Sequence, residues 1–199
     1  MAVFPAEDNL MSRPADESLE NLVGRAKAGD RGAFSTIVRQ LMNQVAALTY
    51  RMTGDRDTAL DLAQETFVSA WQNLGGYRGE ADFTHWITRI ATNKSLNLLK
   101  AARKFVDARE AEAVIAGETS PAAGQDTALE RRELSDRVLA FMDSLPPQQR
   151  AVFELRFYQQ MTFDQIAEAT GRAVGTVKTN YREAVKKLRI LAQETGLRS

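Results

Sequence analysis

Residues 162–191 read TFDQIAEATGRAVGTVKTNYREAVKKLRIL, two helical patterns separated by a glycine. Thr162 and Gln165 have the spacing of a capping box, in which the threonine accepts from the backbone N–H three residues on and the glutamine reaches back. Ile166 and Ala167 are expected to face the core, and Gly171 supplies the turn between the helices. The stretch therefore predicts a helix-turn-helix.

The second helix of this unit has two contrasting faces. Its apolar stripe consists of Val174, Val177, Tyr181, Ala184, Val185, Leu188 and Leu191. The other face carries Lys178, Thr179, Arg182, Lys186 and Arg189. Lysine and threonine can reach base edges in the major groove, and arginine and lysine can hold phosphate. We predict DNA contact by this face; the alternative is an amphipathic helix with a solvated basic face.

The overall charge limits how such a protein can use DNA. The chain has 199 residues, no net charge and a sequence pI near 6.6. Bulk DNA affinity comes from phosphate neutralisation, so tight binding by the chain alone is not expected. Bases concentrate between Arg172 and Ile190, where Glu183 is the only acid. A neutral chain with one basic helix indicates a local DNA contact assisted by a larger partner.

Several classes of site are excluded by composition. The chain has no cysteine and a single histidine, His85, so neither thiolate chemistry nor a histidine-pair metal site is expected. No run approaches the roughly 18 apolar residues of a membrane span, so direct membrane insertion is not expected. Residues 1–17 are acidic and lack an apolar segment, which predicts a disordered leader rather than a secretory signal. These features fit a cytoplasmic protein.

The rest of the chain predicts an all-α protein of two small helical domains joined by a flexible linker. The first domain covers 18–102, the linker 103–132 and the last domain 133–199. Apolar steps of three and four predict helices over 19–28, 32–52, 57–74 and 82–103. The expected inward residues of the second helix include Val38, and the helix that begins at Pro146-Pro147 is expected to bury Val152, Phe153, Leu155 and Phe157. A surface helix around 108–116 is the alternative for part of the linker.

Three further stretches resemble one protein family. Residues 57–71, DTALDLAQETFVSAW, are similar to the polymerase-binding helix of sigma factors, with its D-x-x-Q-E-x-F core. Residues 77–93, YRGEADFTHWITRIATN, resemble the family's −10-reading loop and helix, with its F-x-x-W-x-x-R-I-A-x-N pattern. Residues 174–179, VGTVKT, resemble the start of its −35 recognition helix, and Leu145-Pro146 with Gln149-Arg150 matches the start of its last domain. The resemblance covers about 18–191 and implies the compact extracytoplasmic-function class of bacterial sigma-70-type RNA polymerase sigma factors.

The resemblance implies a role for each stretch, with sigma region 2 over 18–102 and sigma region 4 over 133–199. The expected polymerase-binding residues are Asp61, Gln64 and Glu65. The expected −10 DNA-binding residues are Tyr77, Arg78, Trp86, Arg89, Asn93, Lys94 and Asn97. The expected −35 DNA-binding residues are Arg172, Thr176, Lys178, Thr179, Arg182 and Lys186. The implied partners are core RNA polymerase, promoter DNA and an anti-sigma factor, with no cofactor, metal or small-molecule substrate.

Alternatives remain for some residues and for the function. Trp86 also fits a core tryptophan, and the acidic face around Asp61 also fits a solvated surface. Asn180 and Glu183 depart from the arginine that many relatives carry at one of these positions, so the −35 sequence is left open. A stand-alone DNA-binding regulator conflicts with the zero net charge. An enzyme is not expected, because the glycine-rich stretch 75–79 lacks the Gly-Lys-Ser/Thr of a phosphate-binding loop.

Overall fold

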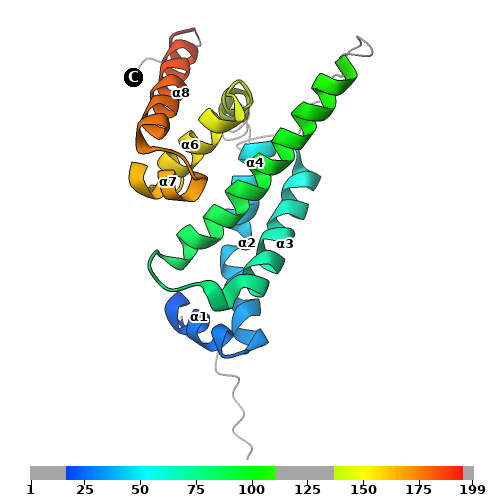
Figure 1. The fold of residues 1–199 in the computed structure, drawn as a ribbon, viewed down its shortest axis with the longest axis vertical. Coiled ribbons are helices and arrows are strands. Elements are labelled where there is room, and N and C mark those ends of the chain that lie inside the picture. The colour runs from blue at the N-terminus through cyan, green and yellow to red at the C-terminus, as the bar shows by residue number, and fades with distance from the viewer. Residues whose placement is uncertain (1–16, 111–136, 195–199) are drawn as a thin grey trace, which may run out of the picture.

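The structure, a computed structural model, describes residues 17–110 and 137–194, with the side chains of 103–110 and of Glu194 left out. Within these ranges the secondary structure is entirely helical (Figure 1). The elements in chain order are α1 (Leu19–Lys27), α2 (Arg31–Thr53), α3 (Arg56–Asn73), the short 3-10 helix η1 (Leu74–Gly76), α4 (Phe83–Glu110), α6 (Pro147–Phe157), α7 (Phe163–Thr170) and α8 (Val174–Glu194). Residues 137–143 are also helical. This confirms the expected all-α fold; the leader over 1–16 and the linker over 111–132 lie outside the described residues.

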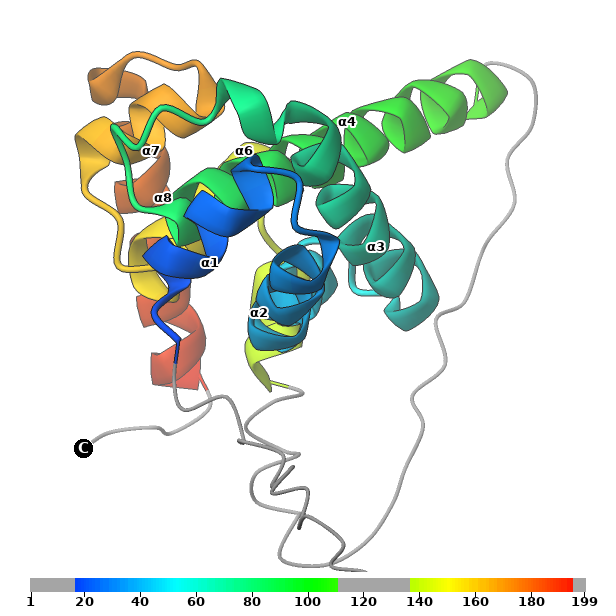
Figure 2. The same ribbon diagram turned by 90° about the horizontal axis from the view of Figure 1, so that it is seen from below.

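The first module consists of α1 to α4, with α2 between its neighbours (Figure 2). Side-chain oxygens cap three of these helices at their first turns: Ser18 accepts from the Asn21 N–H, Asp30 from Ala33 and Asp55 from Thr58. The buried core includes Leu22, Ile37, Leu48, Met52, Phe67 and Ile87. Val38, expected inside, is only partly buried at the edge of the core, whereas the neighbouring Ile37 is fully enclosed.

Helix α4 is longer than expected. It continues to Glu110, past the predicted end at Arg103, so the first part of the predicted linker is helical. Residues 100–110, KAARKFVDARE, contain neither glycine nor proline and are rich in residues with high helix propensity. The prediction was wrong here because it took low apolar periodicity as a sign of flexibility. A helix that projects from the module does not need a second buried face, and α4 extends beyond its neighbours in Figure 1.

The last module contains the predicted helix-turn-helix. Both hydrogen bonds of the capping box between Thr162 and Gln165 are present, and Gly171 ends α7 in the left-handed conformation at φ 64°. Ile166 and Ala167 are buried as expected. The expected burial of Phe157 was wrong, since this side chain is 52% exposed. It stacks on Phe153, one helical turn earlier, at a ring distance of 5.3 Å, and is the last residue of α6.

The two modules pack against each other through α6 and α7, which contact α2 and α4. Arg150 of α6 is buried and donates to the Met52 carbonyl at 2.7 Å. Met52 lies in the last turn of α2, where carbonyls have no partner within the helix, so Arg150 caps α2 from the other module. The same guanidinium donates to the Asp143 carbonyl at 3.0 Å and pairs with its carboxylate at 3.0 Å. Burial lowers the pKa of Arg150, and the charge of Asp143 opposes that shift.

A second buried contact joins α2 to α6. Glu154 has no solvent exposure and accepts two hydrogen bonds of 2.7 Å from Arg51. Burial acts to lower the pKa of Arg51, but the hydrogen bonds and charge of Glu154 outweigh it and raise that pKa. The Arg51 guanidinium also lies 4.0 Å from the centre of the Tyr158 ring, a cation–π contact. Arg51 and Glu154 therefore pair with each other only while the modules are together.

Candidate polymerase and nucleic-acid interfaces

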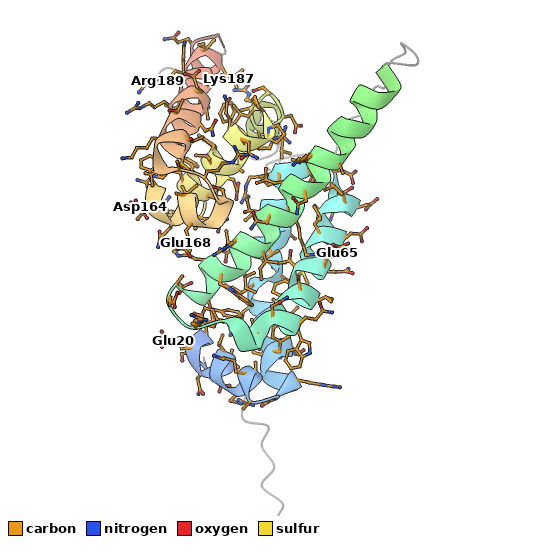
Figure 3. The ribbon with its side chains drawn as sticks, in the orientation of Figure 1. Glu20, Glu65, Asp164, Glu168, Lys187 and Arg189 are labelled. Atoms are coloured by element: carbon orange, nitrogen blue, oxygen red, sulfur yellow. The ribbon has the colours of Figure 1, made fainter. Side chains whose placement is uncertain are left out.

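Helix α3 presents the predicted polymerase-binding residues on one exposed face. Asp61, Gln64 and Glu65 are all exposed, whereas Leu62, Ala63 and Phe67 of the same helix are buried. The three residues line a shallow groove together with Val68, Ser69, Gln72 and Lys94. Glu65 and Glu168 lie on opposite sides of α4, so this face is remote from α7 (Figure 3). The alternation of buried and exposed positions thus leaves an acidic face free for a partner.

Two features of this face were not anticipated. Val68 is an apolar side chain beside the acids and is 57% exposed. Its position four residues after Gln64 could have indicated that it lies on the same exposed face of the helix. Lys94, expected to hold DNA phosphate, instead pairs with Glu65 at 3.1 Å. Since the carboxylate is largely exposed, this pair is weak and both groups can exchange partners.

Three aromatic rings cluster at the start of α4. Tyr77 and Phe83 each lie with ring centroids 5.4 Å from that of Trp86. The Tyr77 hydroxyl donates to the Ala81 carbonyl at 2.7 Å, which fixes the loop before the helix. Burial raises the pKa of this hydroxyl, and nearby carboxylates add to the shift. Trp86 packs on the core, as one of its two alternatives expected, and also lines a cavity; its −10 role stays a prediction.

That cavity, of about 270 Å³, lies between the two modules. Its wall on the first module includes Tyr77, Arg78, His85, Trp86 and Arg89. Its wall on the last module is formed by Met161, Gln165, Glu168 and Ala169. The structure thus brings four of the predicted −10 residues to one site, which α7 covers from the other side.

The polar face of α4 also meets α7 directly. Arg89 pairs with Glu168 at 3.3 Å, and the Asn93 side-chain amide donates to the Ala169 carbonyl at 3.2 Å. Asn97, one turn further on, is exposed. The predicted spacing by four is therefore confirmed as one face, but two of its three members contact protein here.

The predicted −35 face of α8 is open. Every residue expected to contact this DNA element is exposed: Arg172, Thr176, Lys178, Thr179, Arg182 and Lys186. Val177 and Ala184 lie on the opposite face and are fully buried. Glu183 is exposed next to Arg182, so it adds a negative charge at the edge of this surface. These side chains are therefore accessible on one surface of the last module.

The contacts between modules include residues that the sequence did not single out, chiefly Arg51 and Glu154. The only local signal was a glutamate among the apolar residues of α6, where a charge needs a buried partner. The described part of the chain contains no cluster of three or more potential metal ligands, and none of its helices is long and apolar enough to cross a membrane.

Comparison with known proteins gives the class. Two family profiles match the chain, sigma-70 region 2 over residues 37–105 and sigma-70 region 4 over residues 135–188. The RNA polymerase sigma-H factor of Pseudomonas aeruginosa is 31% identical over 184 residues, which cover 86% of this chain and 93% of that protein. The extracytoplasmic-function (ECF) sigma-E factor of Escherichia coli is 32% identical over 173 residues, covering 82% and 90%. The ECF sigma factor SigW of Bacillus subtilis is 29% identical, covering 85% of this chain and 95% of its own length.

Solved structures show the same fold. A sigma factor RpoE of Bartonella quintana, in complex with the anti-sigma factor NepR, superposes with a TM-score of 0.62 at 20% identity over 80% of this chain and 96% of that one. The protein CnrH, in complex with the cytosolic domain of CnrY, gives a TM-score of 0.63 at 23% identity over 87% and 96%. The profiles and relatives define a sigma-70-type transcription initiation factor. The chain belongs to the extracytoplasmic-function group of these RNA polymerase sigma factors.

Proposed function

We propose that the chain docks on core RNA polymerase through the exposed face of α3, with Asp61, Gln64 and Glu65 as its polar contacts. The observation that supports this role is the solvent exposure of all three side chains on a helix whose other face is fully packed. Carboxylates favour a basic partner surface, and the exposed Val68 supplies an apolar contact among them.

For the −10 element, we propose that α4 and the loop before it hold the unpaired non-template strand. Tyr77 and Trp86 offer ring surfaces for a base displaced from the stack, and Arg78 and Arg89 offer charge to phosphate. Asn93 has both a donor and an acceptor, so it can read a base edge. Asn97 extends the same face of α4. Lys94, on the side of α4 that meets α3, exchanges its partner Glu65 for a phosphate of the strand. The chain thereby supports strand opening by capturing unpaired bases rather than by chemistry of its own, and we propose that it is not an enzyme.

For the −35 element, we propose that α8 enters the major groove with its N-terminal half. Thr176, Lys178 and Thr179 lie where a recognition helix reaches base edges. In this proposal Arg172, Arg182 and Lys186 hold the phosphates on either side. Their common exposure, against the buried stripe of Val177 and Ala184, supports this assignment.

We also propose regulation by an anti-sigma factor, in the cytoplasm where the polymerase acts. The support comes from the two solved structures of similar fold, each of which is a complex with a further protein: NepR, an anti-sigma factor, in one and the cytosolic domain of CnrY in the other. An apolar groove in the last module, lined by Phe141, Phe153, Phe157, Leu188 and Leu191, offers such a partner a surface.

Transcription in vitro tests the proposed function as a whole. The purified chain is combined with bacterial core RNA polymerase on a library of promoter fragments, with core alone as the control. We expect start sites that depend on the chain, and their alignment yields both promoter elements. Tight DNA binding by the chain alone, without binding to core, would instead indicate a stand-alone regulator.

Lys178→Ala and Arg182→Ala are expected to weaken transcription from promoters that need their −35 element. Each variant loses one contact to a base edge or a phosphate, which costs about 1–3 kcal/mol, or roughly 5- to 150-fold. Transcription is measured on the promoters found above, and affinity for core is measured in parallel. Arg39→Ala, an exposed cation of α2, is the matched control. Unchanged output from a −35-dependent promoter would refute the assignment of α8.

Asn93→Ala is expected to change base preference at the −10 element. Alanine cannot donate to or accept from a base edge, so discrimination at one position is expected to fall by about 1–3 kcal/mol. The measurement is transcription across a series of single-base substitutions in the −10 element. Asn73→Ala, which removes an exposed amide of α3, provides the control. An unchanged preference at every position would show that Asn93 does not read the strand.

A further inference from the structure

The contacts that α7 makes with α4 have the chemistry of a nucleic-acid strand. The Glu168 carboxylate lies 3.3 Å from the Arg89 guanidinium, as a backbone phosphate would. The Ala169 carbonyl accepts from the Asn93 amide at 3.2 Å, as a base-edge acceptor would. In Figure 3, Glu168 lies on the side of α7 that faces α4, whereas Asp164 of the same helix lies away from it. Two groups of α7, a carboxylate and a carbonyl, thus contact Arg89 and Asn93, which are both proposed to bind the −10 strand.

The exposed ion pair between Arg89 and Glu168 is too weak to keep the two modules together by itself. Glu168 is 70% exposed and Arg89 47% exposed at their side chains, and ion pairs in that setting contribute little. The association is stabilised by buried and partly buried contacts: Glu154 with Arg51, the Arg150 guanidinium with the Met52 carbonyl, and Gln159 with Gln44 at 2.8 Å. Ala151 of α6 also belongs to the buried core of the first module. These contacts define a closed form with a specific geometry.

We propose that the free chain closes on itself and that α7 is an internal competitor for the −10 strand. The proposal rests on the assignment of the α4 face to −10 binding. In the closed form Arg89 and Asn93 are occupied, while the −35 face of α8 remains exposed. The α3 face around Asp61 is also exposed. Polymerase can therefore dock on the closed chain, but the −10 strand is bound only after the modules separate.

Arg51 is the residue through which closure can be changed most cleanly. Arg51→Met keeps an apolar contact for the Tyr158 ring but leaves the Glu154 carboxylate buried without its cation. Opening the modules hydrates that carboxylate, so we expect the ratio of open to closed chain to rise about 100-fold or more. Adding Glu154→Gln removes the buried charge and keeps an acceptor for Gln159, whose side chain donates to Glu154 at 3.0 Å. The double variant is therefore expected to close again.

Distances between two spin labels test closure directly. The chain has no native cysteine, so Gln40→Cys in α2 and Gln193→Cys in α8, both at exposed positions, label one site in each module. Pulsed electron resonance on the otherwise native chain is expected to give one narrow distance distribution. Arg51→Met is expected to broaden and lengthen it, and the double variant with Glu154→Gln to restore it. Circular dichroism confirms that each variant remains helical.

A broad, long distribution in the parent chain would overturn closure, and a narrow, short one in Arg51→Met would refute the role of the Arg51–Glu154 pair in stabilising it. Competition with DNA is tested by forming the complex with core polymerase and promoter DNA, where the distance is expected to lengthen. A transcribing complex that retains the short distance would refute the role of α7 as a competitor. Absence of any chain-dependent transcription would instead count against the proposed function, so the two failures are separable.

Discussion

Replacing Asp61 with lysine is expected to weaken binding of core RNA polymerase about 100-fold. The substitution places a cation in the acidic face of α3, which we propose meets a basic partner surface, and like charges opposed across an interface cost several kcal/mol. Asp61 is exposed, and among the residues that the structure describes none forms a side-chain hydrogen bond or ion pair with it, so the fold is expected to persist. Affinity is measured by fluorescence anisotropy of a labelled chain titrated with core. Transcription should fall in proportion at limiting polymerase.

Glu20→Lys provides the matched charge reversal for this experiment. Glu20 is an exposed acid of α1, away from the groove around Asp61 (Figure 3). We expect the affinity of the Glu20→Lys variant for core to stay within about threefold of the affinity of the parent chain, since charges beyond a Debye length are screened. Equal affinities for the Asp61→Lys and Glu20→Lys variants would show that α3 is not the docking surface.

Replacing Arg150 with methionine is expected to lower the free energy of unfolding by about 2–4 kcal/mol, because buried acceptors lose a charged donor. The residue is 8% exposed and donates to the Met52 carbonyl at the end of α2 and to the Asp143 carbonyl before α6. Methionine fills the space but donates no hydrogen bond. Urea denaturation followed by circular dichroism measures the loss.

The same variant should also change how cooperatively the chain unfolds. Arg150 joins α2 to the start of the last module, so its loss is expected to separate the unfolding of the two modules into distinct transitions. Arg39→Met, at an exposed position of α2, is the control and is expected to change stability by less than about 0.5 kcal/mol. A single transition at the stability of the parent chain would mean that the cap on α2 contributes nothing.

The helices and their caps could be predicted because their signals are local. Thr162 and Gln165 lie three residues apart, and Gly171 needs only its own left-handed conformation, so the helix-turn-helix is determined within a few residues. The exposed faces of α3 and α8 followed from the same periodicity, whereas the polymerase-binding role proposed for α3 came from the family resemblance. The exposure of Phe157 did not, because a stripe of apolar residues cannot show which edge of it remains uncovered.

The arrangement of the modules could not be predicted from these signals. Arg51 and Glu154 lie about a hundred positions apart in the chain, and no local pattern connects them. Arg89 and Asn93 were predicted from a motif that describes contacts with DNA, whereas their contacts in the structure are with α7. A motif indicates what a side chain can bind, but the competing intramolecular partner depends on packing between α4, α6 and α7.

The buried pair of Arg51 and Glu154 also constrains how this sequence can diverge. Loss of either charge alone leaves the other buried in the closed form, whereas loss of both removes the penalty. The two positions are therefore epistatic: a substitution that is harmful in the present background becomes acceptable once its partner has changed. Among descendants that preserve the closed form, arginine and glutamate at these positions are expected to be inherited together or replaced together.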